Sequence, residues 1–379
     1  MVTVAVTSEV KGEPRVAVSP ETVKKLAALG CTVRITSGIG LQSRFADEAY
    51  KAAGATIVPD SAATLAGADL LLKVLRPSAE EIAALAPGAM AAAIMSPFDD
   101  RPGLESLAAK GVSLFAMEFM PRITRAQSMD VLSSQANLAG YKAVVDAAAM
   151  FEQALPMMMT AAGTVPAARA FVMGAGVAGL QAIATARRLG AIVSATDGRP
   201  ATKEQVASLG AKFIAVEDEE FKQAQTAAGY AKPMSDAYQK KQAELVASHL
   251  KTQDIVITTA LIPGRPAPRL ITRAMVESMK PGAVIVDLAA ERGGNCELTE
   301  PDKVTEHGGV RIFGPVNLAR SVPVNASSLY AKNLLNFLET MFDKKTKTLA
   351  INWDDEIIKG TLIAKGGQLV HPSLTAKGA

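Results

Sequence analysis

A glycine-rich stretch in the middle of the chain has the spacing of a phosphate-binding loop. The pattern Gly174-x-Gly176-x-x-Gly179 directly follows the apolar run 171–173 and precedes a stretch, 180–189, that predicts a helix. In such a loop the first glycine permits a tight turn, the second lets the backbone approach a pyrophosphate, and the third allows close contact between helix and strand. The helix N-terminus then presents unpaired N–H groups to phosphate. The pattern alone is weak, but here it has the strand and the helix that it requires, so it predicts dinucleotide binding.

An acidic residue follows the next strand, where it can select the kind of dinucleotide. Asp197 lies 18 residues beyond Gly179, just after the predicted strand 192–195. A carboxylate at this place accepts hydrogen bonds from the adenosine ribose and repels a 2′-phosphate, which favours NAD(H) over NADP(H). Arg199 is a complication, because a nearby arginine can accommodate that phosphate. The alternative is a glycine-rich turn of an α/β fold that binds no ligand.

Polar side chains crowd the segment Pro121–Gln135 (PRITRAQSMDVLSSQ), which follows a predicted strand and enters a long helix. These groups could hydrogen-bond a nicotinamide carboxamide and its ribose. They could equally form a solvated helix start, with Thr124 or Ser128 as the cap and Asp130 favoured by the helix dipole. The residues themselves leave both interpretations open. The same holds for the segment 229–233, either a lid over a cofactor or a surface loop.

The first third of the chain alternates strand and helix signals, which predicts a mostly parallel sheet covered on both faces. Ser19 and Pro20 mark a helix start, and Gly30 follows its end. The expected strands are 2–6, 33–36, 55–58, 69–74, 89–95 and 112–118. The expected helices are 20–29, 47–53 and 103–110.

A long helix expected over residues 128–154 leads into a second α/β unit. Its expected strands are 170–173, 192–195, 212–215, 255–258, 283–287 and 310–313. A further long helix, 326–342, precedes a tail with short strands around Asp354-Asp355 and Gly366-Gly367. We therefore expect two Rossmann-like domains with doubly wound sheets, joined by long helices and separated by a cleft. Residues 1–135 with 326–379 would form the first, and 136–325 the dinucleotide-binding second.

Composition and charge argue against several classes of protein. The 379 residues are 49% hydrophobic and 20% charged, typical of a globular protein long enough for two domains. A formal net charge of +3 provides no electrostatic attraction for nucleic acid, so we expect no such partner. Two cysteines indicate a reducing compartment, and neither they nor the three scattered histidines have metal-ligand spacing. No apolar run reaches the roughly 18 residues of a membrane-spanning helix.

Several long segments together resemble one family, the soluble NAD(H)-binding component, domain I, of the proton-translocating NAD(P) transhydrogenases. The resemblance extends over essentially the whole chain, and its long uninterrupted segments make it specific. The segments that carry it are RVAVSP (15–20), MPRITRAQSMDVLSSQANLAGY (120–141), PMMMTAAGTVP (156–166), the glycine loop with 180–184, GYAK (229–232), TTALIPGRPAP (258–268), 280–289, GGNC (293–296) and 331–338.

The resemblance implies a homodimer that binds NAD(H) in the cleft between its domains. It implies Re/Si-specific hydride transfer from NADH to NADP⁺ held on a separate domain III, coupled to proton translocation by a membrane domain II. The chain would be cytoplasmic and attached to the membrane through these partners. Because it ends without a membrane segment, we expect a separately encoded subunit or a chain cut at a domain edge. Hydride transfer between two nicotinamides needs no general acid or base, so the protein would contribute positioning.

The resemblance also carries residue roles over by position. The nicotinamide would be positioned by Arg122, Gln127, Asp130 and Ser133. The pyrophosphate would contact the loop at Gly174, Gly176, Val177, Ala178 and Gly179. The adenosine end would lie against Asp197, Gly198 and Arg199. The remaining expected cofactor contacts are Arg125, Gln242, Ala260, Leu261 and, in a mobile loop, Gly229 and Tyr230.

Two other functions are weighed against this one. Alanine dehydrogenase, which the family resembles in fold, would require a lysine after an early strand, a histidine after the next and a late aspartate. Lys73 fits, but Ser96 occupies the region expected for the histidine, and the late acid would be Glu291. Without an imidazole to handle the substrate proton, amino-acid oxidation is disfavoured. The second alternative is a module that senses NAD without turnover, which the sequence leaves open.

Overall fold

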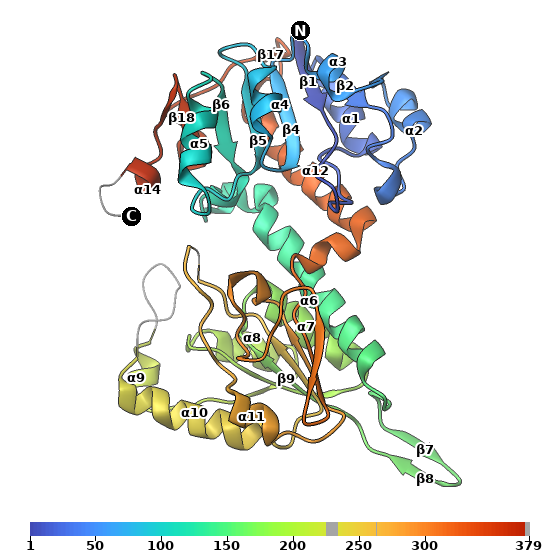
Figure 1. Ribbon diagram of the computed structural model, residues 1–379, viewed down its shortest axis with the longest axis vertical. Coiled ribbons are helices and arrows are strands. Elements are labelled where there is room, and N and C mark those ends of the chain that lie inside the picture. The colour runs from blue at the N-terminus through green and yellow to red at the C-terminus, as the bar shows by residue number, and fades with distance from the viewer. Residues whose placement is uncertain (225–233, 263, 376–379) are drawn as a thin grey trace. The chain divides into compact units, whose positions relative to one another are not determined.

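The computed structural model describes residues 1–224, 234–262 and 264–375. The chain divides into two compact units, each with its own sheet and core. The first unit comprises Met1–Gln135 and Val322–Ala379, and the second comprises Ala136–Ser321. Figure 1 shows their elements.

The first unit is built on an eight-stranded sheet in the order β19-β18-β6-β5-β4-β1-β2-β3. The neighbouring strands β6, β5, β4, β1, β2 and β3 run parallel to one another. At the edge opposite β3, β18 is antiparallel to β6, and β19 is antiparallel to β18. In β4 (Leu70–Leu75) every residue but the last is buried, as expected of a parallel strand covered on both faces. The other strands are β1 (Val2–Val6), β2 (Cys31–Thr36), β3 (Thr56–Val58), β5 (Met90–Ile94), β6 (Ser113–Ala116), β18 (Leu362–Lys365) and β19 (Gln368–Leu369).

Five helices of the first unit begin at a residue whose side chain caps them. Ser19 caps α1 (Pro20–Ala28) by accepting from the N–H of Thr22, and Pro20 occupies the first turn, as predicted. Asp355 caps α13 (Glu356–Thr361) in the same way. The prediction of a short strand around Asp354-Asp355 is therefore wrong, because Asp355 caps the start of a helix. The other helices are α2 (Asp47–Ala52), α3 (Ser61–Leu65), α4 (Ala79–Ala83), α5 (Arg101–Ala108), α12 (Pro323–Glu339) and α14 (Pro372–Thr375).

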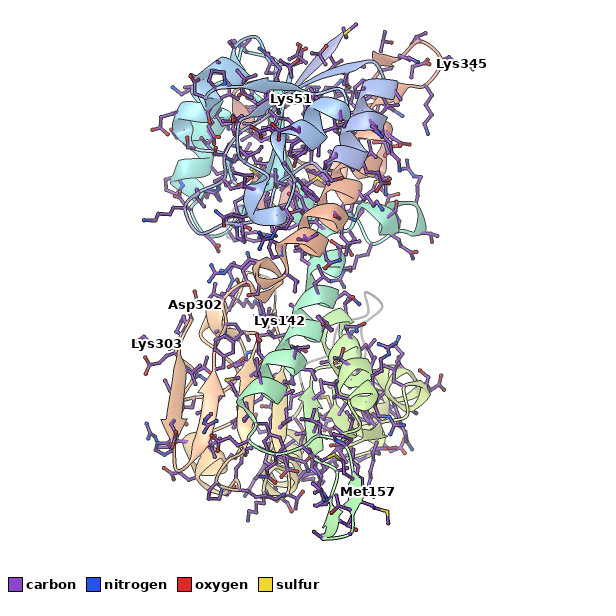
Figure 2. The ribbon with its side chains drawn as sticks, turned by 90° about the vertical axis from the view of Figure 1, so that its right-hand side faces the viewer. Lys51, Lys142, Met157, Asp302, Lys303 and Lys345 are labelled. Atoms are coloured by element: carbon purple, nitrogen blue, oxygen red, sulfur yellow. The ribbon has the colours of Figure 1, made fainter. Side chains whose placement is uncertain are left out.

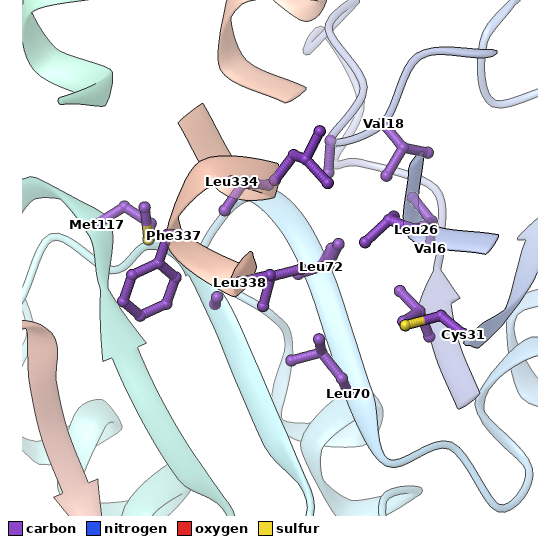
Figure 3. Close-up of a cluster of buried hydrophobic side chains, with 14 of the residues drawn as sticks. Val6, Val18, Leu26, Cys31, Leu70, Leu72, Met117, Leu334, Phe337 and Leu338 are labelled. Atoms are coloured by element: carbon purple, nitrogen blue, oxygen red, sulfur yellow. The ribbon is translucent and has the colours of Figure 1, made fainter. Parts of the chain in front are cut away.

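Residues from both ends of the chain make the core of the first unit. Figure 3 shows Leu338 of α12 beside Leu72 of β4, with Leu334, Phe337 and Leu70 in the same cluster. All five side chains are at most 1% exposed. Burial of five large apolar side chains contributes on the order of 10 kcal/mol before chain entropy is subtracted. Helix α12 is thus an integral layer of this unit.

The second unit contains a seven-stranded sheet in the order β11-β10-β9-β12-β13-β15-β14. Only β14 is antiparallel among its described strands. The chain leaves β9 toward β10 and β11, then returns to β12 on the other side. Doubly wound sheets bind ligands at such a switch point, beyond the carboxyl ends of the strands. The strands are β9 (Arg169–Met173), β10 (Ile192–Thr196), β11 (Lys212–Phe213), β12 (Ile255–Thr258), β13 (Val284–Asp287), β14 (Val304–His307) and β15 (Val310–Phe313).

The long helix expected from Ser128 begins three residues later, as α6 (Val131–Met150). A 3-10 helix, η3 (Thr124–Met129), precedes it, and the carboxylate of Asp130 between them accepts from the N–H of Ser133 at 2.9 Å. The remaining helices of the second unit are α7 (Val177–Arg188), α8 (Thr202–Ser208), α9 (Glu219–Lys222), α10 (Asp236–Leu250) and α11 (Arg273–Glu277). Among the residues that the structure describes, no helix is long and apolar enough to span a membrane.

A two-stranded hairpin extends from the second unit. Its strands are β7 (Met158–Thr160) and β8 (Gly163–Val165), and all six residues are exposed. Met157, labelled in Figure 2, stands at its base with 61% exposure, and Met159 is 77% exposed. The sequence analysis did not predict this hairpin.

Candidate functional site

The glycine loop lies at the carboxyl end of β9, beside the switch point of the second sheet. Gly174 has a φ of +106°, which an L side chain rarely adopts. Its N–H donates to the carbonyl of Thr196 at the end of β10, at 2.8 Å. The turn predicted at Gly174 is therefore present, and it directs the chain from β9 into α7.

The other two glycines of the loop differ in whether the surrounding protein atoms leave room for a side chain. A Cβ on Gly179 would lie 1.8 Å from the carbonyl oxygen of Gly174, so only glycine fits there. A Cβ on Gly176 would meet no protein atom within 4 Å. No side chain among the described residues caps α7 at Gly176, and the adjacent Val177 is 42% exposed. The start of α7 thus provides accessible N–H groups of the kind that bind phosphate.

Asp197 links the end of β10 to the glycine loop. One carboxylate oxygen accepts from the N–H of Ala175 at 2.8 Å. The guanidinium of Arg199 folds back onto the same carboxylate, with two contacts of 2.8 and 2.9 Å, and this raises the pKa of Arg199. The arginine that could accommodate a 2′-phosphate is therefore already paired with the acid that would repel one. Gly198 between them is exposed.

Gln242 joins the site from α10, and its side-chain amide hydrogen-bonds other protein groups. Its carbonyl accepts from the N–H of Val216 at 2.9 Å, and its amide donates to the hydroxyl of Thr196 at 3.2 Å. These bonds fix the ends of β10 and β11. Gly229 and Tyr230, the expected loop contacts, lie outside the described residues.

The segment after β12 also borders the glycine loop. The hydroxyl of Thr259 donates to the carbonyl of Gly174 at 3.2 Å. Ala260 follows, and Leu261 is 44% exposed. The structure thus brings Ala260 and Leu261, both predicted from the resemblance, to the same sheet edge as the loop.

The polar segment of the first unit is anchored by buried apolar residues, while its polar groups remain near the surface. Ala126 and Met129 lie in the core, whereas Arg122 and Gln127 are exposed and Ser133 is partly buried. Asp130 accepts from both the N–H and the hydroxyl of Ser133, at 2.9 and 2.5 Å. Asp130 therefore serves as a helix cap in this structure.

Asparagines of α12, which the sequence analysis did not single out, hold this segment in place. The side-chain amides of Asn333 and Asn336 donate to the carbonyl of Ser128 at 2.8 and 3.0 Å. The sequence signal that could have identified them is their spacing of three residues, which places both amides on one face of the helix. Arg125 is engaged elsewhere, in a two-point ion pair with Asp355 that lowers the pKa of this acid.

Gly140 of α6 is a second residue that sequence reasoning missed. A Cβ there would lie 2.0 Å from the carbonyl oxygen of Ala178 in the first turn of α7. The amide of Asn137, one turn earlier, donates to the side chain of Gln181 at 3.2 Å. The two helices therefore meet backbone to backbone beside the glycine loop.

Lys73, the residue that alanine dehydrogenase chemistry would use, is 2% exposed and has acceptors for its three N–H donors. Its ammonium donates to the carbonyl of Ser8 at 2.5 Å, to Glu81 at 3.0 Å and to the hydroxyl of Thr7 at 3.4 Å. Glu9 lies 3.9 Å away, and burial raises the pKa of Glu9 to about 7.

The two other positions that alanine dehydrogenase chemistry requires, a histidine and an aspartate, hold other residues in this chain. Ser96 has no imidazole, and its N–H and carbonyl are bound by the side chains of Glu118 and Arg76. Glu291 is exposed at the 3-10 helix η4 (Ala290–Arg292). Within the described ranges, no three His, Cys, Asp or Glu side chains are grouped to hold a metal ion.

Comparison with known proteins relates the whole chain to one family. Residues 5–139 match the N-terminal domain, and residues 143–372 the C-terminal domain, of alanine dehydrogenase/PNT. The chain is 55% identical over 373 residues to the first of the chains that make up the NAD(P) transhydrogenase subunit alpha of Rhodospirillum rubrum, with 97% of each chain covered. It is 29% identical to the alanine dehydrogenase of Halomonas elongata, over 97% of this chain and 94% of the other.

A solved structure agrees with this relation. The transhydrogenase from Sinorhizobium meliloti has a TM-score of 0.88 and 59% identity, covering 97% of this chain and 100% of that chain. The two Rossmann-like units predicted from the sequence are confirmed as the fold class.

Proposed function

Because the chain belongs to the alanine dehydrogenase/PNT family, we propose that it is the NAD(H)-binding component of an NAD(P) transhydrogenase. The observation that carries this proposal is the glycine loop with Asp197 bonded to it, at the switch point of a doubly wound sheet. The loop provides N–H groups for a pyrophosphate, and the acid provides acceptors for a ribose. The reaction is hydride exchange between this NAD(H) and NADP(H) on a partner domain.

The chemistry demands little of the side chains. Hydride moves as a unit from C4 of one nicotinamide to C4 of the other, and no proton is exchanged with the protein. The chain must hold one ring at a fixed angle and exclude water, which is catalysis by positioning. We assign this role to Arg122, Gln127, Asp130 and Ser133, with Re/Si specificity as the resemblance implies.

Asp197→Ala is expected to weaken NADH binding about tenfold to a hundredfold, because a ribose hydrogen bond to a charged acceptor is lost, which is worth about 1.5–3 kcal/mol. The variant also frees Arg199, so the preference for NADH over NADPH should fall. Calorimetric titration with both nucleotides measures each effect. Asp197→Asn, which keeps an acceptor for Ala175, should have an affinity between those of Asp197→Ala and the unmodified chain. Glu217→Ala, which removes an exposed carboxylate of the same unit, is the control, and an unchanged Kd for Asp197→Ala would eliminate the ribose role.

Gln127→Ala is expected to slow hydride transfer about tenfold at saturating NADH, with a smaller change in NADH affinity, because the ring is held less precisely. Gln127 is exposed, so its replacement leaves the core intact. Stopped-flow single turnovers measure the transfer step, and calorimetry measures binding. The matched control is Gln42→Ala, another exposed glutamine in a 3-10 helix of the first unit. A loss confined to binding would make Gln127 a simple ligand contact.

We further propose that the chain forms a homodimer and that its β7–β8 hairpin packs on the second copy. Isolated two-stranded hairpins are marginally stable in water, and this one exposes Met157, Met159 and Val165. Sedimentation equilibrium of a variant with Met157 and Met159 replaced by Asp should show a weaker dimer.

The NADP(H)-binding domain III and the membrane domain II are the other proposed partners. Proton translocation and location at the cytoplasmic face of a membrane would come through them.

An alanine dehydrogenase would need Lys73 to reach a substrate carbonyl, but all three N–H donors of Lys73 have protein acceptors. Incubation of the purified chain with NADH, pyruvate and ammonium should therefore give no turnover. Robust turnover by the lone chain would overturn the proposal.

The decisive test mixes the chain with a transhydrogenase domain III loaded with NADP⁺. NADH deuterated at C4 is added, and NADPH is analysed by mass spectrometry. Transfer of the deuterium without dilution by solvent protons is the expected result. No transfer, while NADH binds the chain normally, would favour the sensing module.

A further inference from the structure

The segment between β12 and α11 has no regular structure of its own to fix it. The described residues from 259 to 270 contain neither helix nor strand. Ala260 and Leu261, at its start, are among the proposed contacts of the dinucleotide. Apart from the bonds of Thr259 to the carbonyls of Met173 and Gly174, their position depends on contacts with residues outside the segment.

One buried side chain supplies these contacts. Asn295 is 0% exposed, and its carbonyl oxygen accepts from the N–H of Ala260 at 3.0 Å. Its amide nitrogen donates to the carbonyls of Ala260 and Pro268, at 2.9 and 2.8 Å. Both N–H groups of the amide thus have an acceptor, and a single side chain joins the start of the segment to its end.

The backbone of Asn295 and of its neighbour Cys296 is itself held by hydrogen bonds. The backbone carbonyl of Asn295 accepts from the N–H groups of Leu270 and Ile271, at 2.8 and 3.0 Å. The next residue, Cys296, donates its N–H to the buried carboxylate of Asp287, at the end of β13, at 3.0 Å. The same carboxylate accepts from the hydroxyl of Thr258, at the end of β12, at 2.8 Å.

The turn before Asn295 fits only glycine. Gly293 and Gly294 have φ values of +92° and +80°. A Cβ on Gly294 would lie 2.8 Å from the Asp287 carboxylate. This turn directs the Asn295 side chain toward Ala260, so that the segment follows the ends of β12 and β13.

We propose that Asn295 is a positioning residue for hydride transfer. It contacts no nucleotide; it fixes the backbone of Ala260 and Leu261, against which the bound dinucleotide rests. The inference depends on the proposed function. The asparagine amide pairs with the N–H and the carbonyl of Ala260 at once because it has both an acceptor and two donors, and its second N–H reaches Pro268.

The test is the near-isosteric variant Asn295→Asp. A carboxylate still accepts from Ala260, but it faces the carbonyls of Ala260 and Pro268 without a proton to donate, so the segment must shift. Displacement of a reacting group by about 1 Å can slow a reaction about a hundredfold. We expect single-turnover deuteride transfer to domain III to fall at least tenfold at saturating NADH, with a smaller change in Kd.

Thr299→Val is the matched structural control. The Thr299 hydroxyl donates to Asp287 at 2.6 Å, so this variant removes a hydrogen bond from the same network and leaves Ala260 anchored. It should lower the unfolding midpoint without slowing transfer. If Asn295→Asp does not fold, Asn295→Ala removes the anchor without adding charge.

Transfer at the wild-type rate in the folded Asn295 variant would overturn the inference, as would equal slowing in Thr299→Val. Failure of the proposed function has a different signature, because the unmodified chain would then transfer no deuterium.

Discussion

Gly179→Ala is expected to lower NADH affinity more than a hundredfold, which corresponds to about 2.7 kcal/mol of binding free energy. The new Cβ would lie 1.8 Å from the carbonyl oxygen of Gly174, and neither atom belongs to a flexible side chain. The start of α7 must therefore move away from β9, and its N–H groups move with it. Overpacking of this kind also costs about 1–3 kcal/mol of folding stability. Calorimetric titration with NADH and thermal unfolding measure the two effects separately.

Gly176→Ala is the informative comparison, because it separates the fold of the loop from its proposed contact with phosphate. Gly176 has a φ of −79°, which alanine adopts readily, and its Cβ would meet no protein atom. We expect an unchanged unfolding temperature and an NADH affinity weakened by the methyl group at the phosphate side. Wild-type affinity in both variants would mean that NADH binds elsewhere.

Lys73→Met is expected to destabilise the first unit by about 3–5 kcal/mol, because the carboxylates of Glu9 and Glu81, whose side chains are 4% and 15% exposed, lose their counter-charge. Urea unfolding followed by a probe in the first unit measures this loss. Lys25→Met is the control, since Lys25 is 52% exposed in its pair with Glu21, and exposed pairs contribute at most about 1 kcal/mol. If Lys73→Met does not fold, the double variant with Glu9→Gln should recover stability by removing one uncompensated charge.

The deficit of Lys73→Met should widen with pH. Burial raises the pKa of Glu9 from 4.5 to about 7 in the folded protein, even with Lys73 present. Folding is therefore favoured by protonated Glu9 below pH 4.5, and this contribution is lost as pH rises through about 7. Without Lys73 the pKa of Glu9 rises further, so the loss continues to higher pH. A deficit independent of pH between 5 and 8 would contradict this account.

Much of the fold could be predicted from the sequence because its strands are buried on both faces and separated by capped helices. β1, β12 and β15 occupy the predicted residues, and α1 begins at its predicted cap. Helices such as α10 were missed, because charged residues fill several of its turns and leave only Tyr238, Val246 and Leu250 buried. The β7–β8 hairpin was missed because its strands are three residues long and exposed on all sides.

The candidate site could be predicted where the backbone itself imposes the residue type. Gly174 and Gly179 are required by a positive φ and a close approach, and both requirements can be read from the loop pattern. Asn295 could not be found in this way, because its partner Ala260 is 35 residues earlier in the chain. Gly140 could not be found either. The need for a glycine inside this helix is apparent only once the backbone that packs against it is known.

The two units become able to fold at different stages of synthesis, because the chain is made from its N-terminal end. The second unit is continuous, so all of Ala136–Ser321 can fold once it has left the ribosome. The first unit cannot, because Leu334, Phe337 and Leu338 of its core are made only after the whole second unit. At about 5–20 residues per second, the 186 residues between its two segments take about 10–40 s to translate. During that interval the apolar face of β4 that α12 later covers stays exposed, so this nascent sheet is a site that chaperones would need to protect.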